Sequence, residues 1–308
     1  MNKSKLKGNL LLLLTSVVWG ISFIAQSKGV ELISPAAFNG IRCMLGAVVL
    51  VPVILFLDLG RKKAGKQVLK ADKTLLLGGL VCGSLLCIAS TLQTMGMVYT
   101  SPGKSGFITA LYMVLVPIIG LFCGKKTRPV IWISVLIAII GLFNMCVTDS
   151  DGINVGDILT LCCSLIFAFH ILAIDHFSPK VSGVKLAALQ FFVCGALNLI
   201  YVFIFEDLQL KPVLDCYLAI GYSGIFSCGV AYTLQIVGQK YTDPTSASIL
   251  MSLESVFATL TTVLLVACGW DLTGGQLTMR EIMGCVLMFI AIILVQLPEK
   301  KNAKSIKM

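Results

Sequence analysis

Apolar runs of about twenty residues follow one another along almost the whole chain. A helix needs roughly 20 mostly apolar residues to cross the ~30 Å hydrocarbon core of a bilayer. The runs are continuous rather than alternating with period two, which favours helices over barrel strands. The predicted spans are 7–27, 35–57, 74–97, 102–122, 129–148, 156–176, 184–205, 213–237, 244–268 and 279–297. Their connections are short, so the sequence predicts one all-α integral membrane domain of ten transmembrane helices.

The composition excludes the soluble classes. Of the 308 residues, 57% are hydrophobic and 13% are charged, with a mean hydropathy of +0.95. This is too apolar for a surface that meets water. A net charge of +9 would suit nucleic acid only if basic residues clustered on a folded polar surface, whereas here they lie in short connections and tails. We therefore expect a protein that contacts the lipid bilayer and binds no nucleic acid.

The first span has some features of a signal peptide. Lys3, Lys5 and Lys7 precede an apolar run, and Ala25-Gln26-Ser27 weakly resembles a cleavage site. The run is longer than a usual signal core, and its removal would spoil the repeat described below. We expect it to remain as the first transmembrane helix.

The basic residues lie mostly on one side of the membrane. When the connections are assigned to the two sides in turn, 19 of the 24 Lys and Arg residues fall on the side of the N-terminus. Cytoplasmic connections are enriched in Lys and Arg, so both termini are expected in the cytoplasm, with the chain in the cell (cytoplasmic) membrane. The agreement also supports an even number of spans, because one missed span would scramble the alternation.

The twelve cysteines lie almost entirely inside the spans. No CxxC pair or Cys/His cluster has the spacing of metal ligands. We expect small apolar packing residues, with no disulfide framework, no metal and no cofactor.

An internal repeat organises the chain. KGNLLLLLTSVVWGISFIA from Lys7 aligns with VGDILTLCCSLIFAFHILA from Val155 at an offset of 148, and YTSP at 99–102 returns as YTDP at 241–244 at an offset of 142. The longer basic connection after the second span accounts for the difference. Because five is an odd number, the second set of five helices enters the membrane from the opposite side. We expect residues 1–150 and 151–308 to form two inverted five-helix repeats, the second ending in a basic C-terminal tail.

Four segments carry a family resemblance: TSVVWGISF, NGIRCMLGAVVL, GFITALYMVLVPIIGLFCGKK and SASILMSLESVFATL. Together they resemble the EamA family of the drug/metabolite transporter (DMT) superfamily, over almost the whole chain and with no single motif decisive. The resemblance implies a central cavity lined by the first to fourth and sixth to ninth helices, with the fifth and tenth at the periphery. It also implies transport of amino acids or other small metabolites, often as export.

One position departs from the family pattern. The family often has a Glu-Pro pair early in the ninth helix, whereas here Glu254 is followed by Ser255. This departure favours a straighter ninth helix. The family contains no ATPase site, and this sequence likewise has no GxxxxGK[ST] segment.

Ionisable groups within the membrane are costly and usually face a cavity or a partner. If Pro102 and Pro244 are the first residues of their helices, Tyr112 and Glu254 each lie ten residues further on, which is about 15 Å and close to the midplane. Glu254 is thus the best candidate to titrate or to bind a cationic group. The alternative is a buried glutamate that is hydrogen-bonded to Ser or Tyr neighbours for packing.

Three other ionisable residues lie within the predicted spans. Arg42, roughly 10 Å below the outer face, either holds a substrate carboxylate, pairs with Glu254, or snorkels to the boundary. Lys104, one turn into its span, is expected to snorkel. His170 is expected to be a hydrogen-bonded packing residue, since a proton relay would need Glu254 or Asp175 nearby.

The remaining candidates are polar or aromatic side chains that line a cavity or satisfy contacts between helices. Trp19 and Phe23 are four residues apart and share a face, where they would wall an apolar substrate or pack. The predicted substrate-binding residues are Trp19, Ser22, Phe23, Arg42, Gln93, Tyr112, His170, Gln190, Tyr232, Gln235, Ser252 and Glu254.

The sequence therefore predicts a secondary transporter, not an enzyme, which moves a small-molecule metabolite such as an amino acid by alternating access, with export favoured. Two alternatives remain. A membrane-embedded enzyme for lipid-linked substrates would want a cluster of His, Asp or Glu near one leaflet boundary. A non-transporting receptor or assembly protein would lack a cavity or carry a soluble domain. Monomer and homodimer are both open.

Overall fold

The computed structural model describes residues 3–65, 67, 72–100, 102–124, 127–146, 153–269 and 278–297, where all regular secondary structure is helical. Several predicted basic residues, including Lys66, Lys125 and the C-terminal tail, lie outside the described residues. The helices are α1 (Lys3–Val30), α2 (Pro35–Lys63), α3 (Lys73–Met97), α4 (Pro102–Ala110), α5 (Tyr112–Phe122), α6 (Pro129–Cys146), α7 (Val155–Phe177), α8 (Gly183–Phe205), α9 (Leu210–Asp215), α10 (Tyr217–Gly221), η1 (Tyr222–Tyr232), α11 (Thr233–Gln239), α12 (Pro244–Met251), α13 (Glu254–Ala267) and α14 (Met279–Gln296).

The prediction of ten membrane helices is confirmed. Eight helices or helix series in the described part of the chain are long and apolar enough to cross a membrane, and Pro129–Asn144 and Ile282–Val295 are two shorter apolar helices. Three of the long elements are composite: α4 continues into α5, α10 into η1 and α11, and α12 into α13. The element η1 is a π-helix, a form that occurs mostly in short pieces and frequently at functional sites.

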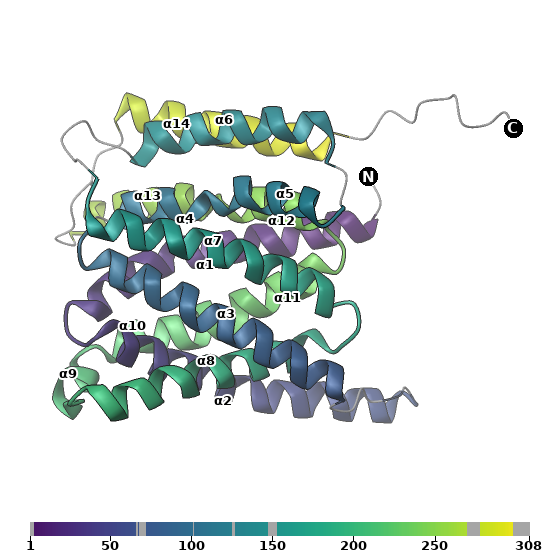
Figure 1. Ribbon diagram of the computed structural model, residues 1–308, viewed down its shortest axis with the longest axis vertical. Coiled ribbons are helices and arrows are strands. Elements are labelled where there is room, and N and C mark those ends of the chain that lie inside the picture. The colour runs from purple at the N-terminus through teal and green to yellow at the C-terminus, as the bar shows by residue number, and fades with distance from the viewer. Residues whose placement is uncertain are drawn as a thin grey trace, which may run out of the picture.

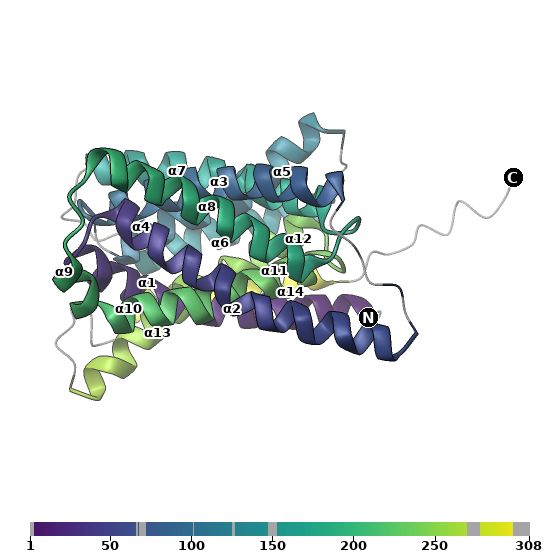
Figure 2. The same cartoon turned by 90° about the horizontal axis from the view of Figure 1, so that it is seen from below.

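The two repeats interleave rather than stand side by side. Two of the most extensive contacts join equivalent helices of the two repeats, α2 with α8 and α6 with α14. The contact of α3 with α7 is matched by that of α1 with the α10–η1–α11 series. In Figure 1, α6 and α14 lie together along one edge and α2 lies along the opposite edge with α8. The view from that opposite edge brings α2 and α8 to the front (Figure 2).

Equivalent glycines bring the repeats together at both ends of the molecule. A Cβ atom on Gly8 would lie 2.9 Å from the carbonyl oxygen of Gly238, and one on Gly156 would lie 2.6 Å from the carbonyl oxygen of Gly96. A backbone carbonyl cannot move aside as a flexible side chain can, so both positions require glycine. The two contacts are copies of one another, as inverted repeats demand.

Two composite helices are interrupted at equivalent places. The break between α4 and α5 falls at Leu111, and the break between α12 and α13 falls at Ser252 and Leu253. Tyr112 is therefore the first residue of α5, and Glu254 is the first residue of α13. The structure places the two predicted midplane residues directly after the interruptions.

The expectation of a straighter ninth helix is wrong in this respect, because α12 and α13 are interrupted without a Glu-Pro pair. The Ser248 hydroxyl donates to the carbonyl of Thr245 and the Ser252 hydroxyl donates to that of Ile249, each at 2.8 Å. Serine side chains that bond to backbone carbonyls in the preceding turn bend helices. The helix thus breaks here without a proline, and the bonds of Ser248 and Ser252 to backbone carbonyls give a physical reason for the break.

Candidate functional site

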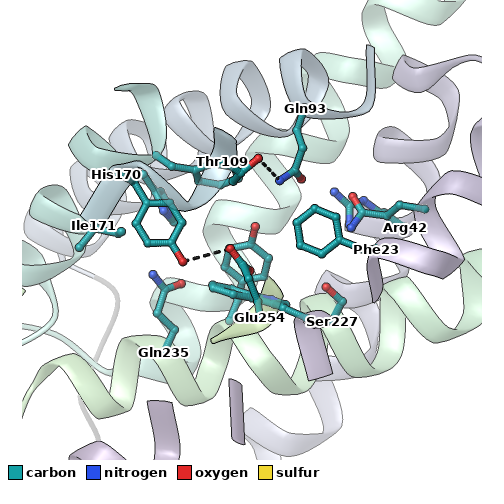
Figure 3. Close-up of a pocket in the computed structure, with 14 residues that line it drawn as sticks. Phe23, Arg42, Gln93, Thr109, His170, Ile171, Ser227, Gln235 and Glu254 are labelled. Atoms are coloured by element: carbon teal, nitrogen blue, oxygen red, sulfur yellow. Dashed lines mark hydrogen bonds between the residues drawn. The ribbon is translucent and has the colours of Figure 1, made fainter. Parts of the chain in front are cut away.

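A central cavity lies where α1, α2, α3 and α7 meet the η1–α11 series and the two interrupted helices (Figure 3). Nearly all its lining side chains are buried. The lining residues are Trp19, Phe23, Gln26, Arg42, Gln93, Thr109, Tyr112, Phe167, His170, Ile171, Ser227, Tyr232, Gln235 and Glu254. Among the described residues, α6 and α14 contribute none of these, as the resemblance implies. The helix α8 also contributes none, although the resemblance places it in the lining.

Nine of the twelve predicted residues line this cavity, and Ser22, Gln190 and Ser252 do not. Two of the three, Ser22 and Gln190, bond to lining residues instead. The Ser22 hydroxyl accepts a hydrogen bond from Gln26 Nε2 at 3.3 Å, and Gln190 Oε1 lies 3.2 Å from His170 Nε2. The Ser252 hydroxyl donates its hydrogen bond to the backbone carbonyl of Ile249 in the preceding helical turn.

Sequence reasoning missed five lining residues: Gln26, Thr109, Phe167, Ile171 and Ser227. Helical spacing was a usable signal for the first three, because Gln26, Thr109 and Phe167 each lie three positions from a predicted residue of the same face. Ser227 lies five residues before Tyr232, and both face the cavity because this segment is π-helical. In an α-helix, residues five positions apart, such as Ser227 and Tyr232, do not lie on the same face.

Tyr112 and Glu254 meet directly at the centre of the cavity. The Tyr112 hydroxyl donates to Glu254 Oε1 at 3.0 Å, and the two residues are 3% and 4% exposed (Figure 3). This bond joins α5 of the first repeat to α13 of the second. Glu254 also stands at the start of α13, where the helix dipole favours a negative charge. Glu254 therefore has the tyrosine partner that its packing role predicts, and it also faces the cavity that its functional role requires.

Arg42 lies in the same cavity without pairing to Glu254. Its Nε donates to Asn39 Oδ1 at 2.8 Å, and its guanidinium stands 5.6 Å from the centre of the Phe38 ring. The residue is only 3% exposed, so it does not snorkel to the membrane boundary. The structure thus holds one carboxyl group and one guanidinium group in a single buried space, each hydrogen-bonded to a neutral partner.

Aromatic rings wall the cavity around Tyr232. Its ring centre is 4.6 Å from that of Trp19, 5.6 Å from that of Phe191 and 6.2 Å from that of His170, all at steep angles. Edge-to-face pairs at such distances stabilise an aromatic cluster. His170 Nε2 lies 3.2 Å from Gln190 Oε1, and no hydrogen bond joins the His170 side chain to Glu254 in the described part of the chain.

Four lining residues carry a buried polar atom without a hydrogen-bond partner in the described part of the chain. They are Trp19 Nε1, Gln26 Oε1, His170 Nδ1 and Gln235 Oε1. A buried polar atom without a hydrogen bond lowers the stability of the fold by about 1–3 kcal/mol. Several such atoms around one cavity therefore indicate that a ligand or water molecules bind there. The set offers both a donor and acceptors.

The cavity is contracted. The space open to the centre of a water molecule is about 30 Å³, room for about two waters and not for a metabolite. Any larger molecule can enter only if the surrounding helices move apart.

An ionic contact joins the two repeats at one end of the molecule, and we call it the charged latch (Thr100, Lys104 and Asp157). Lys104 Nζ lies 2.8 Å from Asp157 Oδ2, with side chains 10% and 7% exposed, and the Thr100 hydroxyl donates to Asp157 Oδ1 at 3.0 Å. The expectation that Lys104 snorkels is wrong, because a carboxylate of the other repeat lies within reach. Asp157 also accepts from the backbone N–H of Asn154, which completes the cap of α7.

The opposite end carries the equivalent contact without charge, which we call the neutral latch (Asn9 and Thr242). The Thr242 hydroxyl donates to Asn9 Oδ1 at 3.1 Å. These residues are the repeat counterparts of Asp157 and Thr100. Ser246 stands where the first repeat has Lys104, and its hydroxyl has no partner in the described part of the chain. The two ends thus share one geometry and differ in charge.

No group of three or more His, Cys, Asp or Glu side chains in the described ranges is arranged to hold a metal ion. Cys43 and Cys194, on the equivalent helices α2 and α8, approach to 3.5 Å between their sulfur atoms as free thiols. We assign no residue to a cofactor.

An inverted pair of five-helix repeats around a buried polar cavity defines a scaffold for membrane transport. Comparison with known proteins gives the family: the chain belongs to the EamA-like transporter family, which matches residues 6–146 and 154–297. Members are transporters rather than enzymes.

Curated relatives match over most of their length. An uncharacterized transporter of Archaeoglobus fulgidus is 29% identical over 95% of this chain and 87% of its own. The uncharacterized inner membrane transporter YedA of Escherichia coli K12 is 25% identical over 91% and 88%. A crystal structure with 18% identity superposes with a TM-score of 0.73 over 94% of this chain and 96% of the other. At that identity the likeness concerns the fold.

Proposed function

We propose that this protein is a secondary transporter that carries a small organic metabolite of the amino-acid type by alternating access between its two repeats, in the direction of export. The observation that carries the proposal is the joint presence of Glu254 and Arg42 in one buried cavity without a bond between them. Buried charges are normally paired. A solute that bears both an ammonium and a carboxylate group supplies a partner to each.

The rest of the lining supports the same class of solute. Trp19, Phe23, Phe167 and Tyr232 offer apolar surface for a side chain, while the unpartnered atoms of Gln26 and Gln235 accept hydrogen bonds. Small-molecule sites commonly combine apolar walls with a few polar groups that fix orientation.

The contracted cavity and the two latches support the alternating-access mechanism. Because a metabolite does not fit the contracted space, entry needs one latch to separate while the other holds. Residues 1–150 and 151–308 are proposed as the two halves that exchange conformations. The same proposal assigns the substrate-binding role to the nine predicted residues that line the cavity.

The proposed orientation keeps both termini in the cytoplasm, from the distribution of basic residues. Two native thiols test it, because Cys123 caps the end of α5 and Cys268 caps the end of α13, and both are exposed. In intact cells, a membrane-impermeant maleimide is expected to label Cys268 and to reach Cys123 only after lysis. Cys123→Ser and Cys268→Ser assign the signals. Labelling of Cys123 in intact cells contradicts the orientation.

The transport proposal is tested with purified protein in proteoliposomes, by counterflow of a panel of labelled amino acids under proton and sodium gradients. Glu254→Gln is expected to lower flux at least about tenfold, since it removes the ionisable partner of the solute amine. Glu31→Gln is the matched control, because Glu31 is exposed and pairs only with Lys28.

Absence of flux for every solute under both gradients, in protein that elutes as a folded species, contradicts the proposed substrate class. Normal flux with an unchanged pH profile in Glu254→Gln refutes the role of Glu254 alone. Export is tested separately, as lower accumulation of the transported solute in cells that express the protein.

A further inference from the structure

A second hollow lies away from the central cavity, between the last turns of α2, the first turn of α8 and the end of α11. We call it the basic groove. Its charged lining residues are Asp58, Arg61, Lys185 and Lys240. All three helix ends lie at the same end of the molecule as the start of α1, and α2 and α8 form the edge of the bundle (Figures 1 and 2).

The groove contains more positive than negative charge. Lys185 Nζ pairs with Asp58 Oδ2 at 2.7 Å, which balances one cation. The Arg61 side chain makes no hydrogen bond or ion pair within the described part of the chain, and Lys240 Nζ donates to the carbonyl oxygen of Val181 at 2.8 Å. Burial, and then the charge of the nearby Arg61, lower the pKa of Lys240. Asp58 is already paired with Lys185, so Arg61 and Lys240 face the hollow as two further positive charges.

The Lys240 side chain is held over the start of α8. A Cβ atom on Gly183 would lie 3.6 Å from Lys240 Cε, so the lysine stem crosses the first turn of that helix. The cap residue Ser182 makes no side-chain hydrogen bond to this turn. The partial positive charge of the helix start adds to that of the two cations.

The groove also has an apolar part. Ile54, Leu57, Val184 and Val237 line it, and Leu57 is 44% exposed. The space open to water centres is about 230 Å³, far more than in the central cavity. One part of the groove is thus lined by the cations Arg61 and Lys240, and another part is lined by apolar side chains such as Ile54 and Leu57.

We propose that the basic groove binds the phosphate group of an anionic phospholipid from the leaflet on the side of the N-terminus, with Arg61 and Lys240 as the binding residues. A phosphate diester between the two cations relieves their mutual repulsion and forms charge-assisted hydrogen bonds. Its acyl chains cover Ile54 and Leu57. Basic pockets between membrane helices are suited to lipid headgroups for these reasons.

Free phosphate carries the same charged group as the lipid headgroup, but it has no acyl chains. The apolar wall favours the lipid, because a free anion leaves Leu57 and Val237 uncovered. The site is independent of the central cavity, so its failure leaves the transport proposal untouched.

The test uses native mass spectrometry of the purified full chain in micelles that contain phosphatidylglycerol and phosphatidylcholine. Wild-type protein is expected to retain one phosphatidylglycerol in preference to phosphatidylcholine. Arg61→Gln and Lys240→Gln are expected to weaken retention about tenfold or more, and Lys240→Arg is expected to restore it. Lys63→Gln is the matched control, since Lys63 is exposed two residues from Arg61 and on another face of α2.

Three outcomes overturn the proposal. The first is a wild-type protein that shows no preference for phosphatidylglycerol, a result that does not depend on any variant folding. The second is equal weakening by Lys63→Gln and Arg61→Gln, which indicates unspecific attraction. If inorganic phosphate alone gives the full thermal stabilisation through Arg61 and Lys240, the ligand is a free anion and the lipid assignment is wrong.

Discussion

Replacing Lys104 by methionine is expected to weaken the closed conformation at one end of the molecule. Two unit charges 2.8 Å apart, as in the charged latch, attract by about 6 kcal/mol at an effective dielectric constant of 20, before the cost of desolvation. Loss of one partner from a buried pair costs about 3–5 kcal/mol. Asp157 keeps its bonds to Thr100 and Asn154, so we expect the lower value, about 3 kcal/mol.

The measurement is the free energy of unfolding in mixed micelles titrated with dodecyl sulfate. Asp157→Asn and the double variant complete a cycle, whose coupling energy is expected to exceed about 1.5 kcal/mol. The control is Thr242→Val in the neutral latch, which removes one neutral hydrogen bond and is expected to cost about 1 kcal/mol. A Lys104→Met variant within about 0.5 kcal/mol of wild type refutes the argument that this pair is shielded from water.

Three further substitutions probe other parts of the structure. Arg42→Ala is expected to raise KM for carboxylate-bearing solutes with little change in kcat, measured by proteoliposome kinetics; an effect on expression alone favours a packing role. Gly8→Ala is expected to lower unfolding free energy by about 1–3 kcal/mol, because its Cβ would meet the Gly238 carbonyl, and an unchanged stability means the helices are further apart. Ser252→Ala is expected to leave KM unchanged, because Ser252 lies behind the cavity lining; a raised KM in the same kinetic assay places its hydroxyl on the solute.

The arrangement of the helices was largely predictable from the sequence. Length, hydropathy and the odd number of helices per repeat determine the number and the inverted order of the spans. Counting residues from the two prolines also placed Tyr112 and Glu254 at one depth, and the structure brings them into direct contact. Depth along a helix follows from a fixed rise per residue.

Rotation about the helix axis and partners from distant segments were harder to predict. Gln190 and Ser252 were expected to contact solute, yet Gln190 bonds to His170 and the Ser252 hydroxyl bonds to the backbone of its own helix. Ser227 enters the cavity through a π-helical segment that hydropathy does not reveal. Lys104 has a buried partner because Asp157 arrives from the other repeat. These features depend on how the repeats interlock, which no local pattern records.

The paired helices α6 and α14 stand apart from the exchange between the halves. They pack chiefly against each other at one edge of the bundle and contribute no described residue to the cavity (Figure 1). Because each is the repeat counterpart of the other, the pair maps onto itself when the two halves swap conformations. It can therefore serve as a stationary frame, and a fluorescent label on its lipid-facing side offers a reference point against which movement of the inner helices is measured.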